Sequence, residues 1–269
     1  MTTALSRVGG IVVRQFYLIR GSFARAVPLF VWVAIDIVLW GFITRYLDSM
    51  QALRFSLVPM LLGAVLLWDF FTRVMQGVTI AFLEDVWSRN FLSLFASPLG
   101  VGEYIAGLVV TSIATSGIGL AVMLLLATLG FGLSFANLGG LLLPFLLILF
   151  LFGIAMGIAG CAMVLRMGPA SEWFVWPIPA LLSPFAGVFY PIATLPEPMQ
   201  WIAYALPPAY VFEGMRAAIL NETFDTRLLA VGAALTLVYI GLAAAWFMAV
   251  FRYAVRTGLL ARYSAESTG

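Results

Sequence analysis

Long apolar stretches without charge alternate along the chain with short segments that carry arginine and acidic residues. No charged residue occurs between Glu103 and Arg166. A transmembrane helix needs about 20 mostly apolar residues, so this stretch is long enough for two of them. The glycine-rich segment 132–140 predicts the turn between them, because glycine interrupts helices. We therefore expect spanning helices at about 104–129 and 138–165.

Four other apolar stretches have the length of a membrane span. The stretches that follow Glu172 and Arg227 carry no charge. The two stretches nearest the N-terminus do carry charge, Asp36 in the first and Asp69 and Arg73 in the second. The pattern predicts an all-α integral membrane protein that forms a single transmembrane domain over residues 1–269. Its six expected spans lie at about 27–46, 56–82, 104–129, 138–165, 172–193 and 228–251.

Three further segments do not fit plain spans. Residues 5–25 mix arginines with large apolar side chains and predict an interfacial helix, either as an anchor or as a strut toward a cytoplasmic partner. Most of the 13 prolines lie between Pro169 and Pro208, so the fifth apolar stretch must be kinked or broken. The segment 195–220 holds too few residues between its prolines to cross. It predicts outer-face re-entrant helices before the last span.

The third segment, at about 84–96, combines charged and large apolar side chains and ends at a Ser-Pro pair. Clustered apolar side chains at a water interface normally dock into a partner. Two interpretations remain open, a helix that lies on the lipid surface and a docking helix for a cytoplasmic protein. The candidate docking residues are Glu84, Asp85, Trp87, Arg89, Asn90, Phe91, Phe95, Ser97 and Pro98.

Composition agrees with a membrane protein and adds an orientation. The chain is 63% hydrophobic and 10% charged, with a mean hydropathy of +1.07, whereas soluble domains carry about 25% charged residues. Arginine is concentrated in the segments that share the side of the N-terminus. Because cytoplasmic loops are enriched in arginine, we expect both termini to be cytoplasmic.

The residue types that are missing exclude several chemistries. The chain has neither lysine nor histidine, and Cys161 is its one cysteine. Without lysine it cannot form a Walker-type P-loop. Without histidine it has no Ser-His-Asp or Cys-His catalytic site and no His/Cys metal cluster. We therefore expect no catalytic residue, no bound metal and no bound cofactor in this chain.

Charged residues within the spans need protein or water around them, because an aspartate at a helix centre costs about 2.5 to 3.5 kcal/mol. Trp32 and Trp40 lie four residues before and after Asp36, so the three share one helix face. We interpret Asp36 either as part of a translocation path or dimer seam, or as a structural hydrogen-bonding group. Asp69 and Arg73 are spaced for an intrahelical ion pair. The candidates for the translocation path or dimer seam are Trp32, Asp36, Trp40, Asp69 and Arg73.

Two smaller patterns complete the candidate list. Gly153 and Gly157 have the small-xxx-small spacing that favours close helix packing. Glu213 and Arg216 are three residues apart, so they are expected to form an ion pair near the outer surface.

The order of these segments resembles the membrane subunit of type-2 ABC exporters. The resemblance rests on the segment 84–98 with Glu103 after it, and on the outer segment 189–216 with its Pro207-Pro208 pair. It implies that 84–96 is a coupling helix docked on a separate ATPase subunit, which binds ATP and Mg. It also implies a homodimer in the plasma (inner) membrane of a bacterium or archaeon. The outer-gate candidates are Phe189, Tyr190, Tyr210, Glu213 and Arg216.

We therefore expect an export permease without nucleic-acid partners, with an amphipathic or lipid-linked substrate such as a glycan, a lipid or a hydrophobic drug. A stand-alone ion- or proton-coupled transporter or channel is the alternative, in which Asp36, Asp69 and Arg73 would carry the coupling. A membrane enzyme that acts on lipids is disfavoured, because the acidic doublet Glu84-Asp85 lacks the spaced partners of a metal site.

Overall fold

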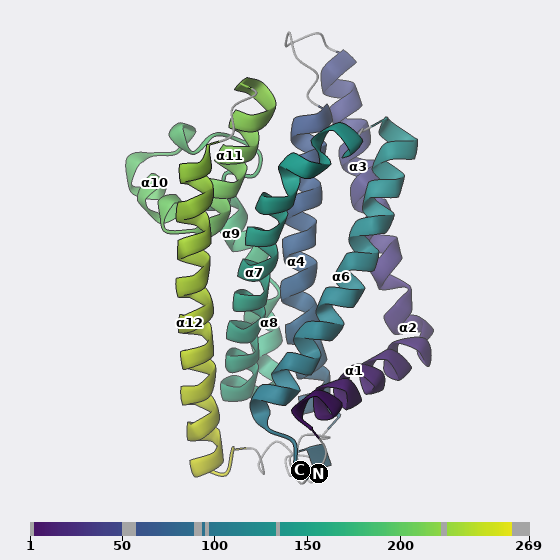
Figure 1. Cartoon of the computed structure of the whole chain (residues 1–269), viewed down its shortest axis with the longest axis vertical. Helices are drawn as coiled ribbons and strands as arrows, with labels where there is room; N and C mark the ends of the chain where they lie inside the picture. The colour runs from purple at the N-terminus through teal and green to yellow at the C-terminus, as the bar shows by residue number, and fades with distance from the viewer. Residues whose placement is uncertain are drawn as a thin grey trace.

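The computed structural model describes residues 3–49, 58–88, 93–94, 97–132, 135–221 and 225–259, and no β-strand occurs in these ranges. Five helices in these ranges are long and apolar enough to cross a membrane, and they form a bundle (Figure 1). They are α3 (Pro28–Ser49), α4 (Val58–Trp87), α6 (Val101–Phe131), α7 (Phe135–Met167) and α12 (Thr226–Arg256). The all-helical class expected from the sequence is confirmed.

The expected fifth span at 172–193 is not one of these long helices. After a short turn of 3₁₀ helix, η1 (Gly168–Ser171), its residues form α8 (Glu172–Val175) and α9 (Ile178–Ala186). These helices carry the chain from the lower to the upper half of the molecule (Figure 1). Prolines precede and interrupt α9, and each removes a backbone donor. The predicted break is therefore present, and six continuous spanning helices are not confirmed.

Short helices lie at both ends of the bundle. At the lower end, α1 (Ala4–Arg20) lies across the long helices and is followed by α2 (Phe23–Ala26) (Figure 1). At the upper end, η2 (Ile192–Thr194) leads into α10 (Glu197–Tyr204) and α11 (Pro207–Asn221), with 8 and 15 residues. Neither α10 nor α11 reaches the length of about 20 residues that a span needs. The start of α1 and the end of α12 lie at the same end of the molecule (Figure 1).

The second span ends later than the sequence predicts. We expected it to end near residue 82, with a separate helix starting near 84, but α4 continues without a break to Trp87. No glycine or proline occurs near this boundary, so nothing in the local sequence stops the helix. Glu84, Asp85 and Trp87 therefore lie in the last turn of α4. Of the rest of the predicted coupling segment, 89–92 and 95–96 fall outside the described residues.

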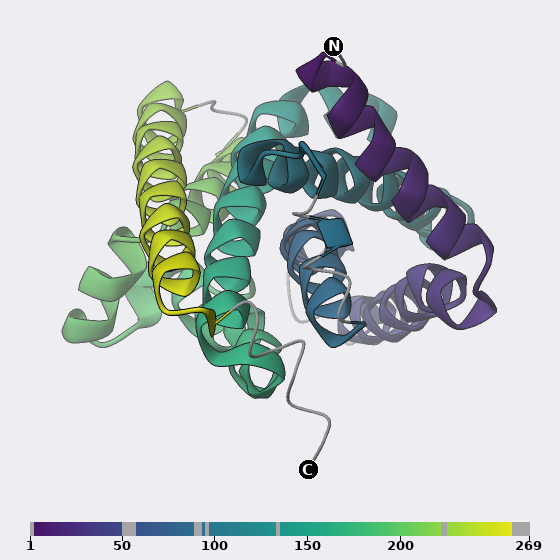
Figure 2. The ribbon, with the colours of Figure 1, turned by 90° about the horizontal axis from the view of Figure 1, so that it is seen from below.

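The centre of the bundle is α4, which is enclosed by α3, α6 and α7 (Figure 2). The α4–α7 contact is close because α7 presents glycines to it. A Cβ atom added at Gly153 would lie 3.0 Å from the Val74 Cβ, and one added at Gly157 would lie 2.9 Å from the Val78 Cβ. Thr79 Oγ1 also donates to the Gly157 carbonyl at 3.1 Å. The predicted role of these glycines in helix packing is confirmed.

Candidate functional site

The two faces of α4 differ in chemistry. The face toward α7 and α12 is apolar and buried, and it is formed by Phe71, Val74, Met75, Val78 and Phe82. The other face carries Asp69, Thr72, Arg73 and Gln76, and after the apolar Ile80 it carries Glu84. Residues three and four apart share one side of a helix, so the residues from Asp69 to Gln76 make a polar stripe. The polar stripe borders a cavity.

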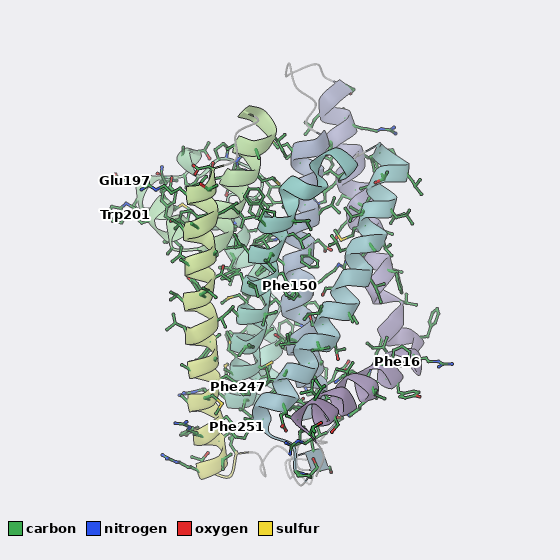
Figure 3. All side chains as sticks on the ribbon, viewed as in Figure 1. Phe16, Phe150, Glu197, Trp201, Phe247 and Phe251 are labelled. Carbon is green, nitrogen blue, oxygen red and sulfur yellow. The ribbon has the colours of Figure 1, made fainter. Side chains whose placement is uncertain are left out.

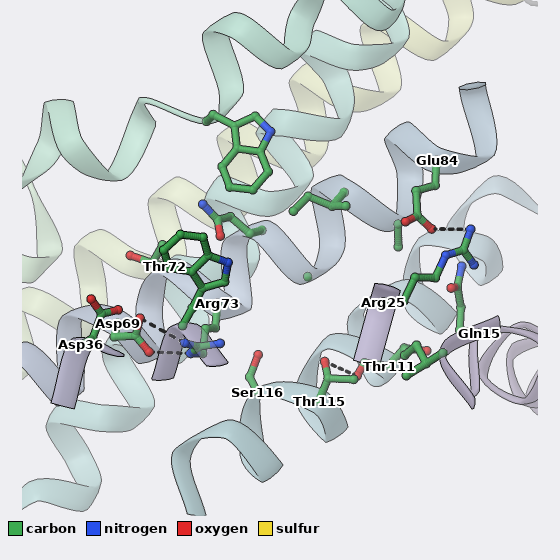
Figure 4. Close-up of a pocket in the computed structure, with 17 residues that line it drawn as sticks. Gln15, Arg25, Asp36, Asp69, Thr72, Arg73, Glu84, Thr111, Thr115 and Ser116 are labelled. Atoms are coloured by element: carbon green, nitrogen blue, oxygen red, sulfur yellow. Dashed lines mark hydrogen bonds and ion pairs between the residues drawn. The ribbon is translucent and has the colours of Figure 1, made fainter. Parts of the chain in front are cut away.

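This cavity has a volume of about 610 Å³ and lies between the N-terminal helices and α3, α4 and α6, with one residue from the α8–α9 junction (Figure 4). Small-molecule sites usually have volumes of about 300 to 1,000 Å³. Its lining combines five charged side chains, hydroxyl and amide groups, and two tryptophans. The lining residues are Gln15, Ile19, Arg25, Trp32, Asp36, Asp69, Thr72, Arg73, Gln76, Gly77, Ile80, Ala81, Glu84, Thr111, Thr115, Ser116 and Trp176.

Three charged side chains lie together at one side of the cavity (Figure 4). Arg73 Nε donates to Asp69 Oδ2 at 2.5 Å, so the predicted intrahelical pair is present. Asp36, from α3, lies next to Asp69 in the cavity lining (Figure 4). Two acidic side chains and one guanidinium thus lie together in the cavity lining.

The two tryptophans predicted to accompany Asp36 have different surroundings. Trp32 lines the cavity beside Asp36 and is 61% exposed. Trp40 stacks on Phe189, with ring centroids 4.9 Å apart. The contact joins α3 to the segment that follows α9, so Trp40 connects α3 to the upper end of the bundle in Figure 1.

A separate group of ion pairs ties the N-terminal helices to the lower ends of α4 and α6. Arg14 forms a bidentate pair with Asp85, in which Nη1 and Oδ2 are 2.9 Å apart, and the Tyr104 hydroxyl donates to Asp85 Oδ2 at 2.7 Å. The hydrogen bonds to Asp85 raise the pKa of Arg14 above its usual value. Because Asp85 is only 2% exposed, these partners offset the cost of burying its charge.

Two weaker pairs flank this buried one. Arg7 Nη2 lies 2.8 Å from Glu103 Oε1, and Arg25 Nη2 lies 3.3 Å from Glu84 Oε2. Arg7 also donates to the Pro98 carbonyl at 2.7 Å. All three pairs have an arginine from the N-terminal segment and an acid from the end of α4 or the start of α6.

The structure places the predicted ATPase-docking residues in three groups. Glu84 and Asp85 are engaged with arginines of the same chain. Trp87 is 49% exposed, and Ser97 and Pro98, which follow it in the chain, are also exposed. The remaining candidates lie outside the described residues, and their docking role stays a prediction. They are Arg89, Asn90, Phe91 and Phe95.

The predicted outer-gate residues form two sets of contacts. Arg216 is 4% exposed and donates from Nη1 to the Gly187 carbonyl at 2.7 Å and from Nη2 to Glu213 Oε1 at 3.1 Å. The same Glu213 oxygen accepts from the Ile192 backbone N–H at 2.7 Å, so the expected pair also holds the 187–192 segment against α11.

The tyrosines of this outer region bond to backbone carbonyls. Tyr190 donates from its hydroxyl to the Pro184 carbonyl at 2.8 Å, and Tyr210 donates to the Tyr204 carbonyl at 2.9 Å. Burial raises the pKa of Tyr210 above its usual value, with the nearby Tyr204 adding to the effect. These contacts fix the outer segment locally, whereas Phe189 reaches α3.

Sequence reasoning missed part of the cavity lining. Thr72 and Gln76 complete the polar stripe of α4, and Thr111, Thr115 and Ser116 come from α6. The sequence did contain a sign of both groups. Polar residues recur every three or four positions from Asp69 onward, and hydroxyl residues recur in the same way in the third expected span. Trp176 and Gln15 had no such signal, because only the folded chain brings them to the cavity.

The bundle of apolar helices makes this chain a multi-pass membrane protein. Comparison with protein families gives a more specific assignment. The family model described as ABC-2 type transporter matches residues 11–220. The chain therefore belongs to the ABC-2 type transporter family and is a permease of an ABC-type transporter. No curated protein matches the chain.

Proposed function

We propose that this chain is the membrane permease of an ABC exporter, and that two copies form the translocation path above a separate ATPase subunit. The observation that carries the proposal is the cavity of about 610 Å³ between the apolar helices of a chain that belongs to the ABC-2 family. ATP and Mg belong to the partner subunit in this proposal, since a lysine-free chain cannot supply a Walker-type P-loop.

The lower end of the molecule is suited to transmit movement from an ATPase. Trp87 ends α4 with its side chain partly exposed, and large aromatic side chains are common anchors of protein interfaces. The pairs that Asp85 and Glu103 form with α1 connect the ends of α4 and α6. A partner that moves the end of α4 therefore also moves α1 and α6, whose side chains line the cavity.

The same proposal includes the topology. The α8–α9 segment crosses as a broken fifth span before α12, α1 lies in the interface, and α10 and α11 enter the outer leaflet and return. Both termini then lie in the cytoplasm, as the arginine distribution favours. The membrane is the plasma (inner) membrane of a bacterium or archaeon, and the substrate is amphipathic or lipid-linked.

The test uses the tagged permease co-expressed with a separate Walker-type ATPase, which we expect a neighbouring reading frame to encode. Trp87→Ala is expected to weaken co-purification of the ATPase about tenfold or more, because interface anchors of this type carry much of the binding energy. Trp201→Ala is the matched control, since Trp201 is also exposed but lies at the opposite end (Figure 3). ATP-driven transport in proteoliposomes should fall with Trp87→Ala only.

Two results would contradict the proposal. If the wild-type permease neither retains the ATPase nor stimulates its ATP hydrolysis, the exporter assignment is wrong. If both tryptophan variants retain the ATPase equally, the docking surface does not include the end of α4.

The second candidate function is a stand-alone ion- or proton-coupled transporter. The observation that favours it is the approach of Asp36 to Asp69 within the cavity, since intramembrane carboxyl groups commonly carry ions or protons. Proteoliposomes that contain only this chain separate the two candidates. Transport driven by an imposed proton or sodium gradient without the ATPase would favour this second function.

A further inference from the structure

The charges of the cavity do not balance. Its lining contains three acids and two arginines. Glu84 is paired with Arg25 at 3.3 Å, and Asp69 is paired with Arg73 at 2.5 Å. No arginine in the described part of the chain lies within ion-pair distance of Asp36. The cavity therefore has one acidic group more than its own cations neutralise.

The position of Asp36 makes this imbalance costly without a ligand. Asp36 lies next to Asp69 in the cavity lining (Figure 4), and the Asp69 carboxyl already has the Arg73 guanidinium as its ion-pair partner. Arg73 can offset only one of the two charges. A positive group supplied from outside would complete the balance, whereas an anionic group would add to the excess of acidic groups in the lining.

The aromatic residues of the lining indicate which kind of cation the cavity would bind. Trp32 and Trp176 both line the cavity and are 61% and 48% exposed, so indole surface is open to a ligand. Tryptophan is the best aromatic partner for a cation. Trp32 lies one helical turn from Asp36, which places an aromatic surface and a carboxyl side by side. A small inorganic cation would use the carboxyl but would gain little from the two indoles.

The two threonine hydroxyls on the α6 side already donate hydrogen bonds within their own helix. Thr111 Oγ1 donates to the Gly107 carbonyl at 2.9 Å, and Thr115 Oγ1 donates to the Thr111 carbonyl at 3.1 Å. Their donors are thus used within the helix, which leaves methyl groups and oxygen acceptors for a ligand. Both suit the apolar body and the weakly polar rim of an organic cation.

We propose that this cavity binds amphipathic organic cations, with the Asp36 carboxyl near the positive charge and the Trp32 and Trp176 indoles around the apolar body. The inference rests on the proposed function as an export permease and names the class of its cargo. The volume of about 610 Å³ suits a drug-sized molecule. One positive charge per ligand is enough, since the imbalance is one charge.

The experiment compares two probes of nearly equal shape and opposite charge, tetraphenylphosphonium and tetraphenylborate. Each is titrated separately onto the full-length permease in nanodiscs by equilibrium dialysis, and empty nanodiscs give the background from lipid partition. Saturable binding is expected for tetraphenylphosphonium alone. Equal saturable binding of both ions, or none for the cation, would overturn the inference.

Variants of the lining test which residues are responsible. Asp36→Asn keeps the shape of the side chain, and it should weaken cation binding at least about tenfold because an unscreened charge contact is lost. Trp32→Leu should weaken it about threefold to thirtyfold through the lost cation–π contact. Glu197→Gln removes an exposed acid at the far end of the molecule and should change nothing (Figure 3).

The possible outcomes test the class of cargo separately from the coupling to the ATPase. Unchanged cation affinity in Asp36→Asn overturns the assignment of that carboxyl, and the Trp32→Leu result stands even if Asp36→Asn does not fold. If the cation does not bind while the ATPase still docks at Trp87, the cargo class is wrong and the exporter remains. If the cation binds but no ATPase associates, the cavity is real and the exporter is wrong.

Discussion

The two faces of α4 have the same spacing and opposite properties. Its apolar face is packed against α7 so closely that an added methyl group at Gly157 would approach Val78 to 2.9 Å. Its polar face borders a cavity of about 610 Å³ and carries Asp69 and Arg73. Close packing contributes dispersion and burial energy, whereas an open polar face contributes little to stability. The helix α4 therefore separates a closely packed interface from a face that borders a cavity.

Asp85 is a buried charged residue of α4, and removing its arginine partner should have the largest effect on stability. Arg14→Met leaves Asp85 buried without its guanidinium, and breaking such a pair costs about 3 to 5 kcal/mol. Arg25→Met is the matched control, because its partner Glu84 is on the cavity side and both side chains are about one-third exposed. That control should cost less than about 1 kcal/mol.

Unfolding in detergent micelles, followed by intrinsic fluorescence, measures both variants. Arg14→Met combined with Asp85→Asn should recover part of the lost stability, since the double variant no longer buries an unpaired charge. Equal losses for the two arginine variants would show that the sides of α4 do not differ as we describe.

The second prediction concerns packing. Gly157→Ala should reduce the free energy of unfolding by about 1 to 3 kcal/mol, because the new methyl group meets both Val78 and the Met75 carbonyl. Gly117→Ala on α6 is the control. It has open space around the added atom, so it should be neutral or stabilising through better helix propensity. A neutral Gly157→Ala would mean that α7 is free to move away from α4.

The smallest expected effect on stability is on the polar face. Gln76→Leu should change the free energy of unfolding by no more than about 0.5 kcal/mol, because the side chain faces the cavity and not a packed helix. Transport by the co-reconstituted permease and ATPase should nevertheless fall. A large loss of stability with normal transport would reverse the roles that we give to the two faces.

Most of the helices could be predicted from the sequence, because length and apolarity alone decide whether a segment can span a bilayer. The break in the 172–193 stretch was also predictable, since proline cannot donate a backbone hydrogen bond. The residue at which α4 ends could not be predicted in this way. A helix boundary without glycine or proline depends on contacts made later, here those of Glu84 and Asp85 with the N-terminal arginines.

The candidate site was predicted in part. Asp36, Asp69 and Arg73 stood out because charge is costly inside a span, and the three lie together as neighbours of one cavity. Trp40 was expected to share their surroundings on the basis of spacing, yet it stacks on Phe189. Spacing places residues on one face of a helix, but a helix as long as α3 has different neighbours along its length.

The sequence by itself determined the membrane class, the long helices and the absence of a nucleotide-binding motif, because these follow from composition and from local hydrogen bonding. Only the tertiary structure decided that Asp85 pairs with Arg14, and that residues of α1, α3, α4 and α6 line one cavity together with Trp176. Such placements depend on contacts between residues far apart in the chain. A hydrophobic pattern specifies which side of a helix is buried, but it does not specify which neighbour buries it.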